Sequence, residues 1–143
     1  MNTISRVFIG VDLGDKRIGL SKSDPLGLIA SPVKTIPAVN INTDVQNVVR
    51  FATECDAQKI IIGLPLLMSG QKGSQANKAS TFAELLSGNT SIPVQAEDER
   101  LSSKEAENIL NFNRQKSKNK NKPLDSYAAA IILQRYLDRI NKA

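Results

Sequence analysis

The chain has 143 residues, a length that suits a single domain over residues 1–143 with a substantial core. It contains no histidine and one cysteine, Cys55, which excludes Ser-His-Asp and Cys-His catalysis, the usual zinc sites and an intramolecular disulfide. Any catalysis must therefore use carboxylates, lysines or hydroxyls, and clustered carboxylates with hard divalent cations fit this composition best.

The net charge of +5 is concentrated in one short segment. Five cations and no acid lie between Asn111 and Pro123, and in the rest of the chain basic and acidic residues are equal in number. A local basic patch on a neutral body indicates a polyanionic partner such as nucleic acid. The five cations are Arg114, Lys116, Lys118, Lys120 and Lys122.

Nothing in the sequence indicates a membrane partner. No apolar run is long enough to cross a bilayer, and the mostly polar segment Met1–Arg6 does not resemble a signal peptide. The single cysteine agrees with a reducing compartment. We therefore expect a cytoplasmic protein.

Hydrophobic patterning predicts five strands and four helices. Alternation on either side of a Gly14-Asp15 turn predicts an opening hairpin, and the run Ile60-Ile61-Ile62 is typical of a buried parallel strand. Asn42 or Thr43 is expected to cap the first helix, and Pro32 to lie at an edge or bulge of its strand. The predicted strands are Val7–Asp12, Arg17–Lys22, Leu26–Ile36, Lys59–Gly63 and Ile92–Glu97, and the predicted helices are Thr43–Glu54, Gln75–Leu86, Ser102–Asn111 and one beginning at Pro123.

This order of elements predicts an α/β fold. Three antiparallel strands that continue through helical crossovers form a mixed five-stranded sheet with helices on both faces. Sheets of this kind place ligand sites at the carboxyl ends of their strands.

Acidic residues occur where such a site is expected. Asp12 ends the first strand, Asp98 and Glu99 follow the last strand, and Asp125 lies in the first turn of the last helix. Brought together, two or three carboxylates bind Mg²⁺ or Mn²⁺. Each acid also has a simpler structural interpretation. Asp12 could be a turn residue, and Glu97-Asp98-Glu99 could be a solvated corner. Asp125 could be a favourable charge at the start of a helix.

Two further segments could hold phosphate. The glycine-containing loop Gly63–Ser74 precedes a helix N-terminus, where backbone N–H groups bind phosphate, although a purely structural loop is equally compatible. The basic segment Arg114–Lys122 could hold a phosphate backbone with strong salt dependence.

Four blocks of the sequence resemble the signature blocks of the YqgF/RuvX family. They are V-D-L-G-D-K-R-I-G-L-S-K-S-D, G-L-P-L-L-M-S-G, D-E-R-L-S-S-K-E-A-E and L-D-S-Y-A-A-A-I-I-L-Q-R-Y-L, in the family's order. The resemblance implies an RNase H-like fold and a nuclease linked to maturation of the 5′ end of pre-16S ribosomal RNA. The family has also been assigned as a Holliday junction resolvase, an activity on four-way DNA.

The resemblance also implies roles for individual residues. The catalytic and metal-binding acids fall on Asp12, Asp98 or Glu99, and Asp125. Lys16 and Arg17 match a Lys-Arg pair of the family, and these two residues, Arg100 and the basic segment are expected to contact nucleic acid. Leu67 and Ser69 depart from the family pattern, which often has Asn and Asp there.

The leading hypothesis is a metal-dependent endonuclease acting on structured nucleic acid, as a monomer or a homodimer. Aromatic residues make up only 4% of the chain, so recognition should rest on shape and backbone. Two other classes of protein stay open. One is a non-catalytic nucleic-acid-binding protein. The other is a nucleotide-dependent phosphotransferase, because V-D-L-G also resembles the first phosphate motif of such enzymes.

Overall fold

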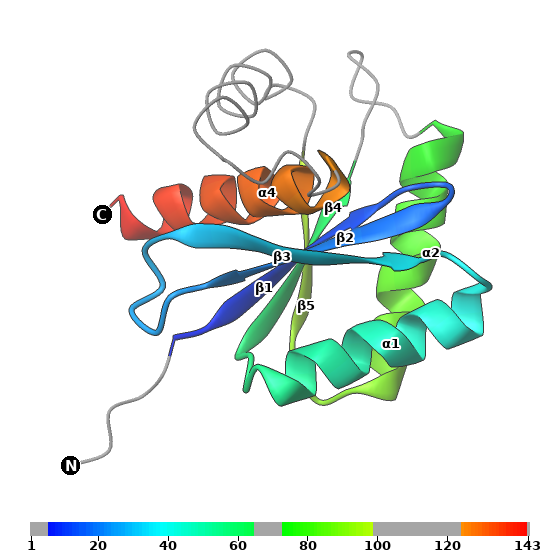
Figure 1. The fold of residues 1–143 in the computed structure, drawn as a ribbon, viewed down its shortest axis with the longest axis horizontal. Coiled ribbons are helices and arrows are strands. Elements are labelled where there is room, and N and C mark those ends of the chain that lie inside the picture. Colours follow the sequence, from blue (N-terminus) through cyan, green and yellow to red (C-terminus); the bar gives the residue numbers. More distant parts are fainter. Residues whose placement is uncertain (1–5, 65–72, 99–123, 143) are drawn as a thin grey trace.

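A computed structural model of the chain describes residues 6–64, 73–98 and 124–142. In these ranges the chain forms one sheet and flanking helices (Figure 1). The strands are β1 (Phe8–Leu13), β2 (Arg17–Ser23), β3 (Ala30–Pro37), β4 (Lys59–Leu64) and β5 (Val94–Asp98), and the helices are α1 (Ile41–Glu54), α2 (Ser74–Asn89) and α4 (Leu124–Asn141). The predicted helix Ser102–Asn111 and the predicted start at Pro123 lie outside the described residues.

The sheet is mixed, as predicted. Its strand order is β3-β2-β1-β4-β5, with β2 antiparallel to both β1 and β3, and β4 parallel to both β1 and β5. The apolar run of β4 lies between two parallel neighbours, and Ile60, Ile61 and Ile62 are completely buried. A strand covered on both faces requires such a continuous apolar run, which explains why it was recognisable in the sequence.

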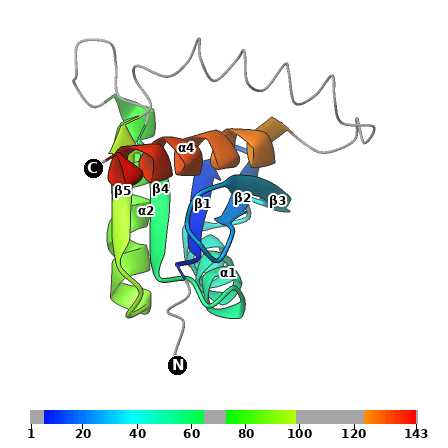
Figure 2. The same cartoon turned by 90° about the vertical axis from the view of Figure 1, so that its left-hand side faces the viewer.

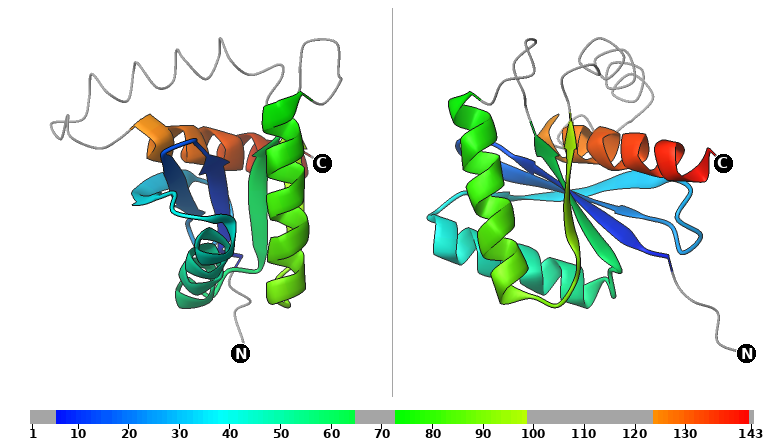
Figure 3. Two further views of the ribbon diagram at one scale, coloured as in Figure 1. Left: turned by 90° about the vertical axis from the view of Figure 1, so that its right-hand side faces the viewer. Right: turned by 180° about the vertical axis from the view of Figure 1, so that it is seen from behind.

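Helices cover both faces of the sheet (Figures 2 and 3). Successive side chains of a strand point to opposite faces. On one face, Ile9 and Val11 of β1 pack into a core with α1 and α2. On the other face, Phe8 and Ile61 pack against Leu133 and its neighbours on α4.

The third strand is shorter than predicted. It begins at Ala30 rather than Leu26, because the Asp24 carboxylate accepts hydrogen bonds from the N–H groups of Leu28 and Ile29 and holds this segment in a turn. The expectation for Pro32 is confirmed, since β3 is an edge strand and its register with β2 shifts at this point.

The first helix begins earlier than predicted. Asn40, rather than Asn42 or Thr43, is the cap, because its side chain accepts a hydrogen bond from Thr43 N (2.9 Å). Val45, Val48 and Ala52, at helical spacing along α1, are all buried.

None of the helices within the described ranges is long and apolar enough to cross a membrane.

Candidate active site

Asp12 lies inside the strand ladder near the carboxyl end of β1. It pairs with Gly19 of β2, and because Val11 pairs with Ile62, the neighbour on the β4 side is Gly63. Asp12 is half-buried, and the residues beside it on both neighbouring strands carry no side chain. In the row of residues that runs across β2, β1 and β4 at this point, Asp12 is therefore flanked by two glycines and alone carries a side chain.

The turn after β1 closes through its own backbone. Gly14 N–H donates to Arg17 O (2.9 Å), and a Cβ at Gly14 would lie 2.4 Å from the same oxygen, so the turn requires glycine. Asp12 precedes this turn and belongs to the β1–β2 ladder. By its backbone, Asp12 is therefore a strand residue.

Asp12 is on the face of the sheet that α4 covers. Alternation along β1 puts Asp12 on the same side as Phe8 and Gly10. Phe8 packs edge-on against Tyr136 of α4, with ring centroids 5.9 Å apart. A Cβ built on Gly10 would lie 2.6 Å from the carbonyl oxygen of Ala129.

The same contacts fix the direction of α4 over β1. Tyr136 lies over Phe8, at the start of the strand, whereas Ala129 lies over Gly10, two residues before Asp12. Moving backwards along α4 therefore means moving towards the carboxyl end of β1, as Figure 1 shows. Asp125 is one helical turn before Ala129, so the first turn of α4 approaches the Asp12 end; the Asp125 side chain lies outside the described residues.

Asp98 does not share the face of Asp12. It pairs in parallel register with Leu64, and Leu64 packs into the core on the α1/α2 side. Directly paired residues of parallel strands point the same way, so Asp98 belongs to that side as well. Glu99 and Arg100 lie outside the described residues.

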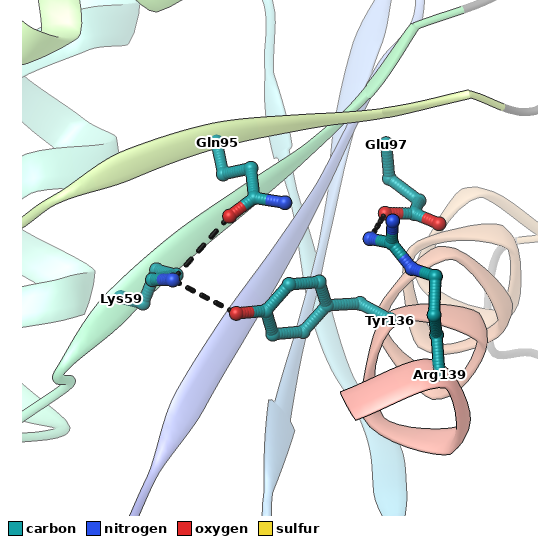
Figure 4. A network of polar contacts seen from close by, with 5 residues as sticks. All are labelled: Lys59, Gln95, Glu97, Tyr136 and Arg139. Atoms are coloured by element: carbon teal, nitrogen blue, oxygen red, sulfur yellow. Dashed lines mark hydrogen bonds and ion pairs between the residues drawn. The ribbon is translucent and has the colours of Figure 1, made fainter. Parts of the chain in front are cut away.

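Glu97, which the sequence analysis did not select, is on the face of Asp12. It pairs with Gly63 and forms an ion pair with Arg139 of α4 (Figure 4). Burial raises the pKa of the Glu97 carboxyl, and the positive charge of Arg139 acts in the opposite direction. The register of β5 against β4 is needed to see this placement. The sequence shows three consecutive acids, Glu97-Asp98-Glu99, but does not show which face of the sheet each one is on.

A polar network extends from Glu97 along the α4 side of β4 and β5 (Figure 4). Lys59 Nζ donates to Tyr136 Oη (2.8 Å) and to Gln95 Oε1 (3.3 Å). Lys59 and Arg139 also both lie over the Tyr136 ring, at 5.3 and 5.5 Å from its centroid. The network ties the C-terminal half of α4 to β4 and β5.

Two predicted cations lie in the described part of the chain, Lys16 and Arg17, and both are exposed. Ile18 packs into the α1/α2 core, so alternation puts Arg17 on the opposite face, with Asp12. The other predicted nucleic-acid contacts lie outside the described residues: Arg100, Arg114, Lys116, Lys118, Lys120 and Lys122.

A half-open hollow of about 180 Å³ lies beneath the β1–β2 turn. Leu13, Ile18 and Phe82 line it, and Lys78 pairs with Asp15 at its rim (3.5 Å). Leu13 and Ile18 belong to the α1/α2 core, so this hollow is on the opposite face from Asp12.

The donor chemistry at the Asp12 end fits a hard divalent cation. The chain contains no histidine, so nitrogen ligands of that kind are absent and carboxylate oxygens are the available donors. Among the side chains that the structure describes, no group of three or more Cys, Asp or Glu could hold a metal ion. Of the predicted ligands, Asp12 and Asp98 are among these described side chains, whereas Glu99 and the Asp125 side chain are not.

Comparison with known proteins agrees with this fold. Residues 6–139 match the RuvX family, described as Holliday junction resolvase. A relative from Clavibacter michiganensis subsp. michiganensis, named "Putative pre-16S rRNA nuclease", is 41% identical over 91% of this chain and 81% of its own length. A relative of the same name from Clostridioides difficile is 44% identical over 91% of this chain and 92% of its own.

Solved structures share the fold at low sequence identity. RuvC of Thermus thermophilus, solved in complex with a Holliday junction substrate, superposes with a TM-score of 0.65 at 16% identity, covering 96% of this chain and 98% of that one. The fowlpox virus resolvase, solved with Holliday junction DNA, gives 0.60 at 15% identity, with 95% and 99% covered.

The fold and the family place this chain among the phosphodiester-cleaving hydrolases with an RNase H-like fold. The chain belongs to the RuvX family.

Proposed function

We propose that this protein is a metal-dependent endonuclease that cuts structured nucleic acid at the carboxyl end of β1. The observation that carries the proposal is the approach of the first turn of α4 to Asp12. It brings Asp125, 113 positions later in the chain, to the end of the sheet where Asp12 lies. The names of the relatives favour pre-16S rRNA as substrate, with four-way DNA as the alternative. We propose the 5′ end of that RNA as the place of cleavage, as the family resemblance implies.

Asp12, Asp125 and one acid after β5 would hold Mg²⁺ or Mn²⁺. We propose Glu99 rather than Asp98 for the third ligand, because the register of β5 puts Asp98 on the α1/α2 side, away from Asp12, and Glu99 is the other acid of the predicted pair. A bound divalent cation lowers the pKa of a coordinated water and neutralises charge at the phosphate.

Neighbouring cations would position the substrate. Arg17, exposed on the face of Asp12, would hold a phosphate next to the scissile one, and Lys16 at the turn would add a less directed charge. Arg100 and the basic segment Arg114–Lys122 would hold phosphates further along the backbone. We propose that the chain acts as one domain, as a monomer or a homodimer, without a membrane partner.

A cleavage assay tests the proposal and separates the two substrates. Purified protein is incubated with a pre-16S rRNA leader and with a four-way DNA junction, in Mg²⁺, in Mn²⁺ and in EDTA. We expect the leader to be cut in either metal, no product in EDTA, and at least a 10³-fold lower rate for Asp12→Asn. The nuclease proposal fails if neither substrate is cut, or if Asp12→Asn cuts like the parent.

Cleavage of the junction alone would assign the alternative substrate. Binding of both substrates without any cleavage would instead support a non-catalytic nucleic-acid-binding protein.

A further inference from the structure

Ser21 of β2 is a buried polar residue that the proposed mechanism does not use. Its side chain is fully buried, and its hydroxyl donates a hydrogen bond to the carbonyl oxygen of Ala129 in α4 (2.8 Å). The two residues are 108 positions apart in the sequence. A carbonyl oxygen has two lone pairs, so Ala129 can accept this bond in addition to the bond within its helix.

The contact fixes α4 at its closest approach to the sheet. Ser21 pairs with Gly10 of β1, and a Cβ on Gly10 would lie 2.4 Å from Ser21 Oγ and 2.6 Å from Ala129 O. The glycine allows the helix backbone to descend onto β1 and β2, and the serine hydroxyl bonds to that backbone there. Three residues from three elements thus define one anchoring point.

This anchoring point adjoins two of the three proposed metal ligands, Asp12 and Asp125. Asp12 is two residues beyond Gly10 on the same face of β1, and Asp125 is one helical turn before Ala129. A small rotation or lift of α4 at Ala129 would therefore change the separation between the two acids. Metal sites are sensitive to such changes in their supporting contacts.

We infer that Ser21 is a positioning residue for the metal site: through its bond to Ala129 it sets the first turn of α4, and with it Asp125, relative to Asp12. This inference rests on the proposed function. It requires no change in the ligand set, because Ser21 acts through the backbone of α4.

The chain offers a matched control in Ser23, two residues further along the same strand. Ser23 is also buried, and its hydroxyl accepts from Phe8 N (2.9 Å) and donates to Asp24 O (2.9 Å). These partners, together with Arg6 O (3.2 Å), belong to β1, to the residues just before it and to the turn after β2, not to α4. A purely structural role of a buried serine hydroxyl would therefore be expected equally from both residues.

Mn²⁺ affinity of the full chain, measured by calorimetry without nucleic acid, tests the inference. We expect Ser21→Ala to weaken Mn²⁺ binding about tenfold and Ser23→Ala to leave it unchanged. In the Asp125→Asn background, Ser21→Ala should cause no further loss, because the two changes act through the same ligand. If Ser21→Ala does not fold, Ser21→Cys, which keeps the shape of the side chain with a larger terminal atom and only a weak donor, should show the same loss.

Parent-like affinity in Ser21→Ala, or an equal loss in Ser23→Ala, would overturn the inference. Measuring Asp125→Asn alongside separates two claims, that Asp125 is a metal ligand and that Ser21 positions it. If Asp125→Asn weakens binding and Ser21→Ala does not, only the positioning role is wrong. If Asp125→Asn itself binds Mn²⁺ like the parent, the proposed ligand set is wrong and the inference falls with it.

Discussion

At the scale of single residues, strand alternation decides which charged groups can act together. Asp12, Arg17 and Glu97 come from three different strands, and the register places all of them on the side of α4. Asp98, one residue after Glu97, belongs to the other side through its pairing with Leu64. Substitutions of two neighbouring residues of similar chemistry should therefore affect function to different extents, depending on which face of the sheet each residue is on.

The pair Lys16 and Arg17 gives a direct test of this rule. We expect Arg17→Ala to weaken substrate binding about tenfold, since it removes a charge-assisted phosphate contact on the face of Asp12. Lys16→Ala, one position away in the turn, should have a clearly smaller effect. Equilibrium binding of the rRNA leader in EDTA measures both variants, and equal losses would refute the assignment of faces.

Glu97 predicts a distinct dependence of stability on pH. Its pKa is raised in the folded state by burial, so the folded protein holds this proton more tightly than the unfolded chain. Its contribution to stability is therefore fully present below the unfolded pKa and is lost as the pH rises through the folded pKa. Glu97→Gln cannot titrate, so the parent should lose stability relative to this variant as the pH rises.

Urea unfolding of the parent and of Glu97→Gln from pH 4 to pH 8 measures this difference. The contributions of the other titrating groups cancel in the difference between the two unfolding free energies, because both proteins contain those groups. A parent that gains stability relative to the variant with rising pH would mean that the ion pair with Arg139 outweighs burial.

At the scale of elements, the packing of α4 on the β1–β2 hairpin is the contact on which the proposed site depends. The sequence predicted the hairpin and the last helix separately, since alternation and helical periodicity are local patterns. It could not predict that Ala129 lies over Gly10, because that contact joins distant parts of the chain. For the same reason, the sequence did not indicate Ser21 or Glu97, whereas it predicted Asp12 and Asp125 from their positions at the ends of elements.

Gly10 should tolerate no side chain. A Cβ there would lie 2.6 Å from Ala129 O and 2.9 Å from Leu133 Cβ, so Gly10→Ala must displace α4. We expect a loss of about 1–3 kcal/mol in the free energy of unfolding. Gly88→Ala in α2 is the control, because a Cβ there meets nothing within 4 Å, and it should stabilise the protein by up to about 1 kcal/mol.

Denaturant unfolding distinguishes the two glycines. If Gly10→Ala were as stable as the parent, the close approach of α4 to β1 would be wrong, and with it the placement of Asp125.

At the scale of the whole molecule, the fold could be predicted from the sequence more completely than the ends of its helices and strands. The mixed five-stranded sheet with helices on both faces was predictable from the order of elements, and the structure confirms it. Helix and strand ends were less predictable, because they depend on side-chain caps such as Asn40 and Asp24. The excess charge lies in the segment Arg114–Lys122, which is outside the described residues.

The basic segment should govern affinity and its dependence on salt. Replacing Lys116, Lys118 and Lys120 by alanine removes three phosphate-neutralising charges. Binding should weaken, and the slope of log K against log salt should become shallower by roughly one unit for each lysine that contacts phosphate. Titrations of the rRNA leader between 50 and 200 mM salt measure this slope, and an unchanged slope would refute a role for the segment.

The central claim is that Asp12 of β1 and Asp125 of α4 hold a divalent cation together. A crystal structure of the protein grown with Mn²⁺, with an anomalous difference map, tests it most directly. We expect an anomalous peak at the carboxyl end of β1, with carboxylate oxygens of both residues within about 2.0–2.6 Å of the ion. A peak elsewhere, or one at Asp12 without Asp125, would contradict it.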